Sequence, residues 1–144
     1  MKILVLNGPN LNMLGIRQPE IYGSTSYHDL VAMIQVEADQ MGVEVSFFHS
    51  NHEGALVDAI QQAYFDKVGG IIINPGAYTH TSVALLDAVK SVMIPTVEVH
   101  ISDPDTREDF RHISYIRPAC VATIKGHGLP GYLEALHLLC DPKN

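Results

Sequence analysis

Residues 70–82 read GIIINPGAYTHTS, and the fold of the chain is organised around this stretch. Its apolar, β-branched beginning is typical of a strand that is buried on both faces of a parallel sheet. The strand must stop after Asn74, because Pro75 and Gly76 cannot continue it. The stretch therefore predicts a central strand that delivers polar groups, among them His80, to its carboxyl end, where ligands bind in open α/β sheets.

Strand and helix patterns alternate over the whole chain. Strands are predicted at Lys2–Leu6, Val43–His49, Gly70–Ile73, Pro95–His100 and Ala119–Ile124, and helices at Tyr27–Met41, Ala55–Phe65, Ser82–Val92, Arg107–His112 and Gly131–Cys140. This alternation predicts βαβ units with right-handed crossovers. We expect one α/β domain over residues 1–144, a flavodoxin-like, doubly wound sheet of five parallel strands with helices on both faces. The strand order 2-1-3-4-5 is expected from the frequency of that fold.

Several helix ends carry their own signals. Ser26 followed by Asp29 resembles a capping box, and Gly42 stands where a left-handed helix cap is expected. Asp105 with Glu108 is a second box-like start, and Pro130 marks the start of the last helix.

The composition excludes several classes of partner. The net charge is −7, with 9 basic against 16 acidic residues, and no basic stripe is present, which argues against nucleic acid and anionic membrane surfaces. No apolar run approaches the ~20 residues that cross a bilayer, and the first run is too short for a signal peptide. We therefore expect a cytoplasmic protein. Because its overall charge repels anions, any anion site must be built locally from arginines and backbone N–H groups.

Polar residues stand at the ends of four predicted strands, in the segments Asn7–Asn12, His49–Glu53, Asn74–Gly76 and Glu98–Ser102. The carboxyl ends of parallel strands lie along one edge of a sheet. We favour a shared site at this edge over ordinary solvated loops, since Asn, His and Glu directly at strand ends are less routine than general loop polarity.

His100 is one candidate for proton transfer at that edge. Glu98 and His100 point to the same side of a strand, so the carboxylate can fix the imidazole tautomer or stabilise its charged form. Taken alone, the pair favours the alternative, a hydrogen-bonded histidine at a strand end.

The connection from Asn7 to about Ser26 has no periodic segment and is long for this fold, as lids often are. It carries Arg17 and Tyr22, between Gly15 and Gly23. A free phenol has a pKa of ~10, so a tyrosinate base at neutral pH needs a neighbouring positive charge such as Arg17. The alternative is an ordinary exposed arginine and a packed tyrosine.

Arg107 and Arg111 share one face if residues 107–112 are helical, and could meet a carboxylate. A surface helix with ion pairs to Glu108 and Asp109 is the alternative. No metal is expected among the eight histidines, because His52-Glu53 lacks the second ligand of a zincin motif at Leu56. The first turn also lacks a dinucleotide-binding glycine pattern, so no cofactor is expected.

Taken together, these motifs resemble one family, the type II 3-dehydroquinate dehydratases. The resemblance rests on Gly8–Asn12, Gly15 with Arg17 to Gly23, Asn51–Gly54, Ile73–Ala77, Thr79–Val83, Glu98–Ser102 and Arg107–Arg111. It implies a cofactor-free, metal-free anti elimination of water from 3-dehydroquinate through an enolate, giving 3-dehydroshikimate. That reaction serves the shikimate pathway to aromatic amino acids, or quinate catabolism.

The resemblance also implies roles for residues. Tyr22 would be the base and Arg17 would lower its pKa, while Asn10 would help to hold a water that stabilises the enolate. His100, oriented by Glu98, would protonate the departing hydroxyl.

By the same resemblance, the substrate would be held by Asn74, His80, Arg111, the Ile101 and Ser102 backbone, and Asp87 from a neighbouring subunit of a homododecamer. One departure from the family pattern is Asp103, which places an added negative charge beside an anion site. The competing hypothesis is a non-catalytic flavodoxin-like module that binds a small anion; the Arg17–Tyr22 pair speaks against it, because a simple binder does not need that pair.

Overall fold

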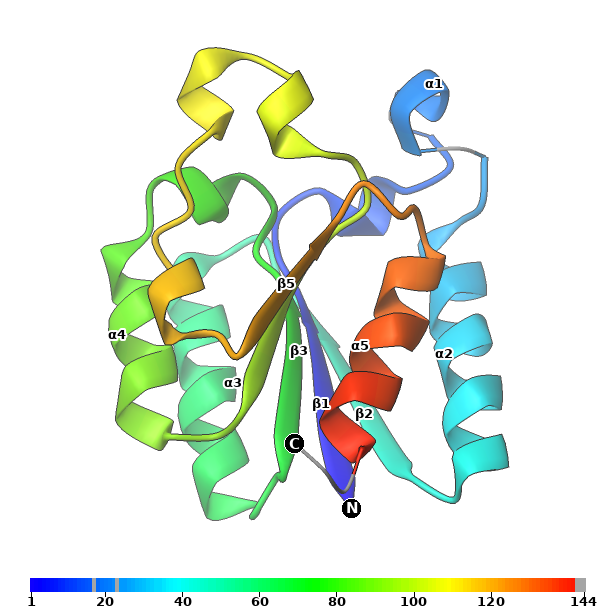
Figure 1. The fold of residues 1–144 in the computed structure, drawn as a ribbon, viewed down its shortest axis with the longest axis vertical. Helices are drawn as coiled ribbons and strands as arrows, with labels where there is room; N and C mark the ends of the chain where they lie inside the picture. The colour runs from blue at the N-terminus through cyan, green and yellow to red at the C-terminus, as the bar shows by residue number, and fades with distance from the viewer. Residues whose placement is uncertain (17, 23, 142–144) are drawn as a thin grey trace.

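The computed structural model describes residues 1–16, 18–22 and 24–141, without the side chains of residues 21 and 22. Five parallel strands form one sheet in the order β2-β1-β3-β4-β5, which confirms the predicted fold class and strand order (Figure 1). The strands are β1 (Lys2–Asn7), β2 (Glu44–His49), β3 (Gly70–Asn74), β4 (Thr96–His100) and β5 (Ala122–Lys125).

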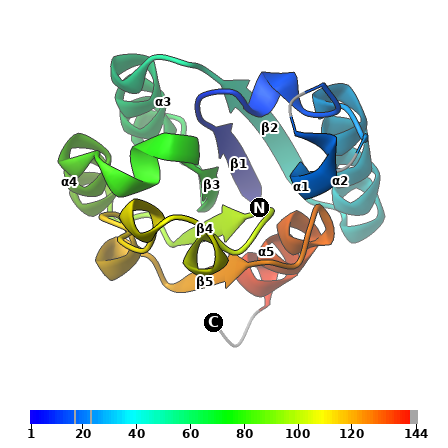
Figure 2. The same ribbon diagram turned by 90° about the horizontal axis from the view of Figure 1, so that it is seen from above.

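Helices cover both faces of the sheet, as expected. The helices are α1 (Pro19–Tyr22), α2 (Tyr27–Met41), α3 (Glu53–Phe65), α4 (Val83–Val92) and α5 (Pro130–Cys140). One core lies under α2 and α5, and the other lies under α3 and α4 (Figure 2). Within the described part of the chain, no helix has the length and apolar character needed to cross a membrane.

Strand β3 is the centre of this arrangement, and all five of its residues are buried. Successive side chains along a strand point to opposite faces. Ile72 accordingly packs into the core under α2 and α5, while Ile71 and Ile73 pack into the core under α3 and α4. A continuous β-branched run satisfies both faces at once, which explains why the segment is apolar without alternation.

Local signals set several helix ends as predicted. Ser26 Oγ accepts a hydrogen bond from the Asp29 N–H at 3.1 Å, and the Asp29 carboxylate accepts one from the Ser26 N–H at 3.2 Å. Gly42 ends α2 with φ 69°, and Pro130 begins α5.

Two local predictions for residues 104–112 were wrong. Residues 107–112 do not form one helix, because this region is two short 3₁₀ turns, Pro104–Thr106 and Asp109–Arg111. The first turn is capped by Asp103, which accepts from the Asp105 N–H at 3.0 Å, so Asp105 and Glu108 make no capping box. Phe110 is 66% exposed, so the segment buries no apolar stripe, and tertiary packing supplies most of the stability of a helix.

The connection between β1 and α2 was predicted to lack regular structure and instead contains the 3₁₀ turn Leu11–Met13 and the helix α1. Leu11 and Leu14 anchor it, because both side chains are buried in the core under α2. Strand β5 begins three residues later than predicted, since Pro118 lies in a 3₁₀ turn before it.

A close backbone approach joins the ends of β1 and β3. The Gly8 N–H donates to the Asn74 carbonyl at 2.8 Å, and a Cβ at Gly8 would lie 2.4 Å from the Pro75 carbonyl oxygen. Only glycine fits at this position, because backbone atoms of the neighbouring turn cannot move aside as a flexible side chain can.

We expect Gly8→Ala to lower the free energy of unfolding by about 2 kcal/mol, because the added methyl group overlaps backbone. Urea denaturation followed by circular dichroism measures this change. The matched control is Gly54→Ala in α3, where an added Cβ meets nothing within 4 Å. That control should be neutral or stabilising by up to about 1 kcal/mol, and equal losses in both variants would contradict the explanation.

Candidate active site

A pocket of about 280 Å³ opens at the carboxyl edge of the sheet, the edge that faces the viewer in Figure 2. This volume is near the lower end of the range for small-molecule sites. The loops after β1, β3 and β4 form its walls. Its lining residues are Pro9, Asn10, Leu11, Leu14, Asn74, Gly76, Ala77, His80, His100, Ile101, Ser102, Pro104, Arg107 and Arg111.

Most of the predicted site residues meet at this pocket. Those that line it are Asn10, Asn74, His80, His100, Ile101, Ser102 and Arg111. Glu98 lies behind His100, whereas Asp87 is exposed on α4 and does not line the pocket. Arg17 lies outside the described residues, as does the side chain of Tyr22; only the Tyr22 backbone, at the end of α1, is described.

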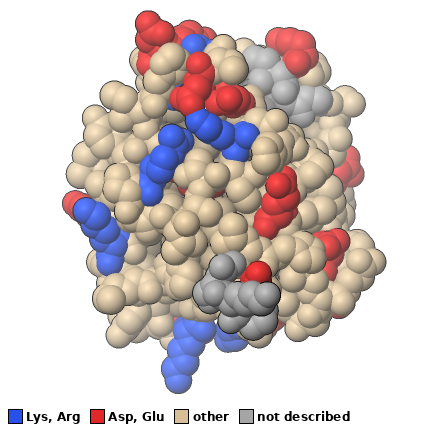
Figure 3. Space-filling model, in the orientation of Figure 1, with Lys and Arg blue, Asp and Glu red and all other residues tan. Residues whose placement is uncertain are grey.

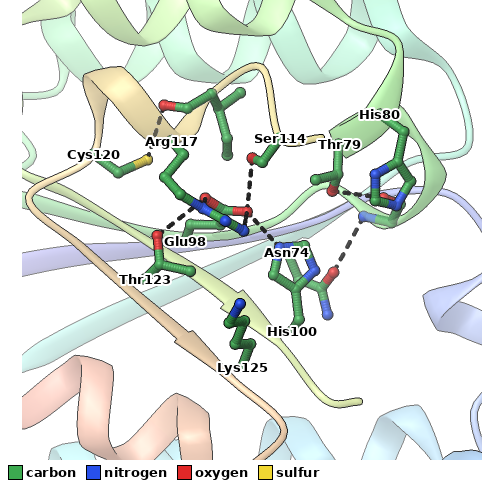
Figure 4. Close-up of polar contacts among 12 residues, drawn as sticks. Asn74, Thr79, His80, Glu98, His100, Ser114, Arg117, Cys120, Thr123 and Lys125 are labelled. Atoms are coloured by element: carbon green, nitrogen blue, oxygen red, sulfur yellow. Dashed lines mark hydrogen bonds and ion pairs between the residues drawn. The ribbon is translucent and has the colours of Figure 1, made fainter. Parts of the chain in front are cut away.

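The His100 imidazole is held by Glu98. Nε2 of His100 donates to Oε2 of Glu98 at 2.5 Å, and the two side chains leave β4 on the same side, as predicted (Figure 4). A carboxylate can only accept, so Nε2 carries a proton. This arrangement leaves Nδ1 as the ring nitrogen that can serve a ligand, since His100 lines the pocket and is 7% exposed.

Glu98 itself has no exposed surface and is surrounded by donors. Its Oε2 accepts from Ser114 Oγ at 2.8 Å and Arg117 Nη2 at 3.2 Å, besides His100. Its Oε1 accepts from Arg117 Nε and Thr123 Oγ1, both at 3.2 Å. Burial alone would raise the pKa of Glu98, but the hydrogen bonds from His100 and Arg117 outweigh it and lower the pKa to about 2.

Sequence reasoning missed Ser114, Arg117 and Thr123. Ser114 and Arg117 lie in an irregular stretch without periodicity, so no pattern marks them. Thr123 is opposite Glu98 in the register of β4 and β5, a signal that is usable only when the strand order and register are known. A buried carboxylate predicts that donors exist, but not where in the chain they lie.

His80 adds a second imidazole to the pocket. Its Nδ1 donates to the Ile113 carbonyl at 2.7 Å, since that oxygen can only accept. Burial lowers the pKa of His80, against this hydrogen bond, which favours the charged form. The imidazole is therefore neutral at neutral pH, and its Nε2 is an acceptor for a hydroxyl.

Backbone groups after β4 also face the pocket. The carbonyl of Ile101 accepts from the Gly128 N–H at 3.0 Å, and that of His100 accepts from the Gly126 N–H at 3.3 Å. In a trans peptide the next N–H points opposite to the carbonyl. The N–H groups of Ile101 and Ser102 therefore point away from the glycine loop, where they suit an anion.

Arg111 places a positive charge in the wall of the pocket. Its Nε pairs with Glu108, and its guanidinium lies 5.0 Å from the centre of the Phe110 ring. The ion pair expected of a surface helix is thus present, although the helix is not. Within the described part of the chain, these contacts leave the terminal nitrogens of Arg111 available to an anion.

The charges of this region are mixed rather than uniformly basic. Figure 3 shows acidic side chains gathered at the top of the molecule, with basic side chains directly below them. Asp103, the departure from the family pattern, caps its own turn and lies 3.9 Å from Lys125 Nζ. Lys125 also pairs with Asp105. The added charge of Asp103 is therefore balanced outside the pocket.

A buried network lies beneath the pocket. The Tyr132 hydroxyl donates to Asn7 Oδ1 at 2.6 Å and accepts from Asn74 Nδ2 at 2.9 Å. Asn74 Oδ1 accepts from the Gly76 N–H at 3.1 Å, which fixes the amide between strand end and turn. Burial raises the pKa of Tyr132, so its hydroxyl stays protonated and serves as a structural donor.

The predicted strand-end site is thus smaller than expected. Asn74 and His100 line the pocket, whereas Asn7 is buried and bonded to Tyr132, and His49 packs its ring against Tyr27. Among residues 1–16, 18–22 and 24–141, no three His, Cys, Asp or Glu side chains are grouped to hold a metal ion.

Comparison with known proteins gives consistent matches. A family model described as dehydroquinase class II matches residues 1–140. A 3-dehydroquinate dehydratase of Caldicellulosiruptor bescii is 58% identical over 138 residues, which are 96% of this chain and 95% of the relative. One of Corynebacterium glutamicum is 56% identical over 142 residues, 99% of this chain and 97% of the relative.

Solved structures agree. The type II dehydroquinase of Butyrivibrio crossotus superposes with a TM-score of 0.96 at 54% identity, covering 96% of this chain and 97% of that one. The type II dehydroquinase of Propionibacterium acnes has a TM-score of 0.91 at 40% identity, with 97% of each chain covered.

The lowered pKa of Glu98 predicts a pH dependence of stability. In the unfolded chain this carboxyl titrates near its ordinary value of 4.5, and in the folded protein near 2. The charged form therefore stabilises the fold above pH 4.5, and this contribution is lost as the pH falls toward 2. We expect Glu98→Gln to cost about 3 kcal/mol at pH 7 and to lose less stability than the wild type between pH 5 and 2.

Urea denaturation at each pH, compared between wild type and variant, measures this contribution. Glu134→Gln is the control, because the Glu134 pair with His127 is solvent-exposed and should change stability by less than about 0.5 kcal/mol. Parallel pH curves for wild type and Glu98→Gln would contradict the assigned charge state.

Proposed function

The chain belongs to the dehydroquinase class II family and acts as a hydro-lyase on 3-dehydroquinate; from this premise we propose that the pocket at the carboxyl edge is the active site. The general role of this activity is the shikimate pathway. The non-catalytic anion-binding alternative is not favoured, because family membership extends over residues 1–140.

In the proposed mechanism Tyr22 is the general base. It removes a proton from the carbon next to the ketone, with Arg17 lowering the pKa of its phenol. The electron pair of the broken C–H bond forms an enolate, which needs stabilising donors. Asn10 helps to hold a water for this purpose; its own N–H donates to Asn51 Oδ1 at 2.9 Å, which supports a fixed position.

The second half of the reaction breaks the C–O bond. The enolate re-forms the ketone, a carbon–carbon double bond forms, and the departing hydroxyl takes a proton to become water. His100 is the proposed acid, and it donates from Nδ1 because Nε2 is engaged by Glu98. Only the imidazolium can donate from Nδ1 while Nε2–H is held, so the Glu98 carboxylate favours the competent form.

The substrate carboxylate and hydroxyls are assigned to the remaining lining groups. We assign the carboxylate to the Ile101 and Ser102 N–H groups, and the hydroxyls to Asn74, His80 and Arg111. No metal or cofactor takes part in this proposal, which follows the family resemblance. The observation that carries the proposal is that His100, His80, Arg111 and the Ile101–Ser102 backbone line one pocket of substrate size.

We extend the proposal to the assembly and location of the protein. The chain is proposed to act as a single catalytic domain, in the cytoplasm, within a homododecamer built as a tetramer of trimers. Asp87 supports a shared site, because it is exposed on α4, away from the pocket of its own chain.

The test of the activity is to mix purified protein with 3-dehydroquinate and follow the absorbance of the enone product. We expect a rise that EDTA does not change. Tyr22→Phe and His100→Ala should each lower kcat by about 10²-fold or more with the fold retained by circular dichroism.

Two outcomes would contradict these assignments. Near-wild-type kcat in Tyr22→Phe would remove it as the base, and loss of activity with EDTA would require a metal. Absence of any enone from the wild-type protein would overturn the enzymatic reading as a whole.

The shared site predicts complementation between inactive variants. Asp87→Ala and His100→Ala should each be inactive alone, and their co-expression should restore about a quarter of wild-type activity if Asp87 serves a neighbour's pocket. Size-exclusion chromatography checks the assembly in parallel. Loss of activity in Asp87→Ala without any complementation would place its role within its own chain or in folding.

A further inference from the structure

Arg117 lies outside the pocket and is held by its own segment. It begins the 3₁₀ turn Arg117–Ala119, between the fully buried Ile116 and Cys120, whose N–H donates to the Arg117 carbonyl at 3.0 Å. The backbone of Arg117 is therefore anchored in the core under α3 and α4. Its side chain is 36% exposed and reaches inward to Glu98.

The Arg117 guanidinium donates hydrogen bonds to both oxygens of the Glu98 carboxylate. Nε donates to Oε1 and Nη2 donates to Oε2, each at 3.2 Å. Oε2 is also the atom that accepts from His100 Nε2 at 2.5 Å. Figure 4 shows both the Arg117 guanidinium and the His100 ring at the Glu98 carboxylate. One carboxylate oxygen is thus shared between a permanent cation and a titratable one.

We propose that Arg117 is a positioning residue for the elimination: it turns the Glu98 carboxylate toward His100 and shares its charge, so that the imidazolium can give up its proton to the departing hydroxyl. The kinetic part of this inference rests on the proposed function, in which His100 is the acid.

Arg117 first fixes the orientation of the Glu98 carboxylate. A guanidinium presents parallel N–H groups in a rigid fork, which fixes the plane of a carboxylate bound by two of them. Thr123 and Ser114 each contact one oxygen of Glu98, so neither can fix that plane alone. With the fork in place, Oε2 faces Nε2 of His100, and the ring presents Nδ1 to the pocket.

Arg117 also changes the charge that His100 experiences. A buried carboxylate with one cationic partner would hold the imidazolium strongly, and an acid that binds its proton too tightly is a poor donor. Arg117 offsets this attraction, because it repels the imidazolium across the shared oxygen. Removal of a positive charge always favours the protonated form of a neighbouring base.

Other ionisable groups near Glu98 and His100 do not supply the positive charge that Arg117 supplies. His80 is neutral at neutral pH because burial lowers its pKa, and burial raises the pKa of the Cys120 thiol to about 12. Lys125 is paired with Asp105 and Asp103, and Arg111 with Glu108. Among the described residues, two basic side chains are therefore bonded to the Glu98 carboxylate: His100 and Arg117.

The test compares Arg117→Met with the wild type over a range of pH. We expect kcat to fall about tenfold, because the acid is misplaced and binds its proton more tightly. KM should stay within about twofold, since Arg117 does not line the pocket. The alkaline midpoint of the kcat profile should rise by about one pH unit, because the imidazolium keeps its proton longer.

Arg117→Lys separates charge from orientation. Lysine keeps the positive charge without the fork, so we expect the alkaline midpoint to return toward the wild-type value while kcat recovers only in part. Lys2→Met is the control for removal of a cation, because Lys2 is exposed at the opposite end of the sheet. It should leave kcat and the pH profile unchanged.

A readout that does not need catalysis separates this inference from the proposed function. In protein labelled with ¹³C at histidine Cε1, the His100 signal is assigned by its loss in His100→Asn. Its titration midpoint should rise by about one pH unit in Arg117→Met. If the wild type forms no enone but the midpoint still moves, the function is wrong and the electrostatic role of Arg117 stands.

Two results would overturn the inference. A lower kcat with unchanged midpoints in both measurements would make Arg117 a purely structural residue. Wild-type kcat at every pH in Arg117→Met would show that Ser114 and Thr123 hold Glu98 without it.

Discussion

A carboxylate with no exposed surface is the constraint on which this end of the molecule depends. Glu98 projects from a buried strand, and an ionised group in such a place is tolerated only when donors satisfy it. Its partners come from its own strand, from β5 and from the irregular segment before β5. The hydrogen bonds that satisfy this one carboxylate therefore join three parts of the chain and hold His100 in the lining of the pocket.

A second buried network of hydrogen bonds fixes the side chains at the ends of β1 and β3, as the Glu98 network fixes His100 at the end of β4. Tyr132 reaches from α5 to Asn7 and Asn74, whose strand ends are paired in register. Because the hydroxyl is fully buried and protonated, it fixes both amides without adding charge. The two networks together hold Asn74 and His100, two strand-end residues that line a pocket built largely from loops.

The proposed active site also reconciles a net charge of −7 with an anionic substrate. Its favourable groups are local: the N–H groups after β4 and the terminal nitrogens of Arg111. Nearby acidic side chains are engaged elsewhere, Asp103 and Asp105 with Lys125, and Glu108 with Arg111. Short-range pairing of this kind leaves a small region suited to an anion within a protein whose overall field is repulsive.

The sequence alone determined the α/β class, the succession of the five strands and of helices α2 to α5, both caps of α2 and the grouping of polar strand ends, because these follow from periodicity and local hydrogen bonding. The same patterns were wrong over residues 107–112, where exposure of Phe110 removes the packing that a helix needs. Only the tertiary structure decided which polar residues share the pocket and which are structural, as with Asn7 and His49. It alone revealed Ser114, Arg117 and Thr123 around Glu98, because the partners of a buried charge are chosen by proximity in space, and no local pattern records contacts between residues 16 to 25 positions apart.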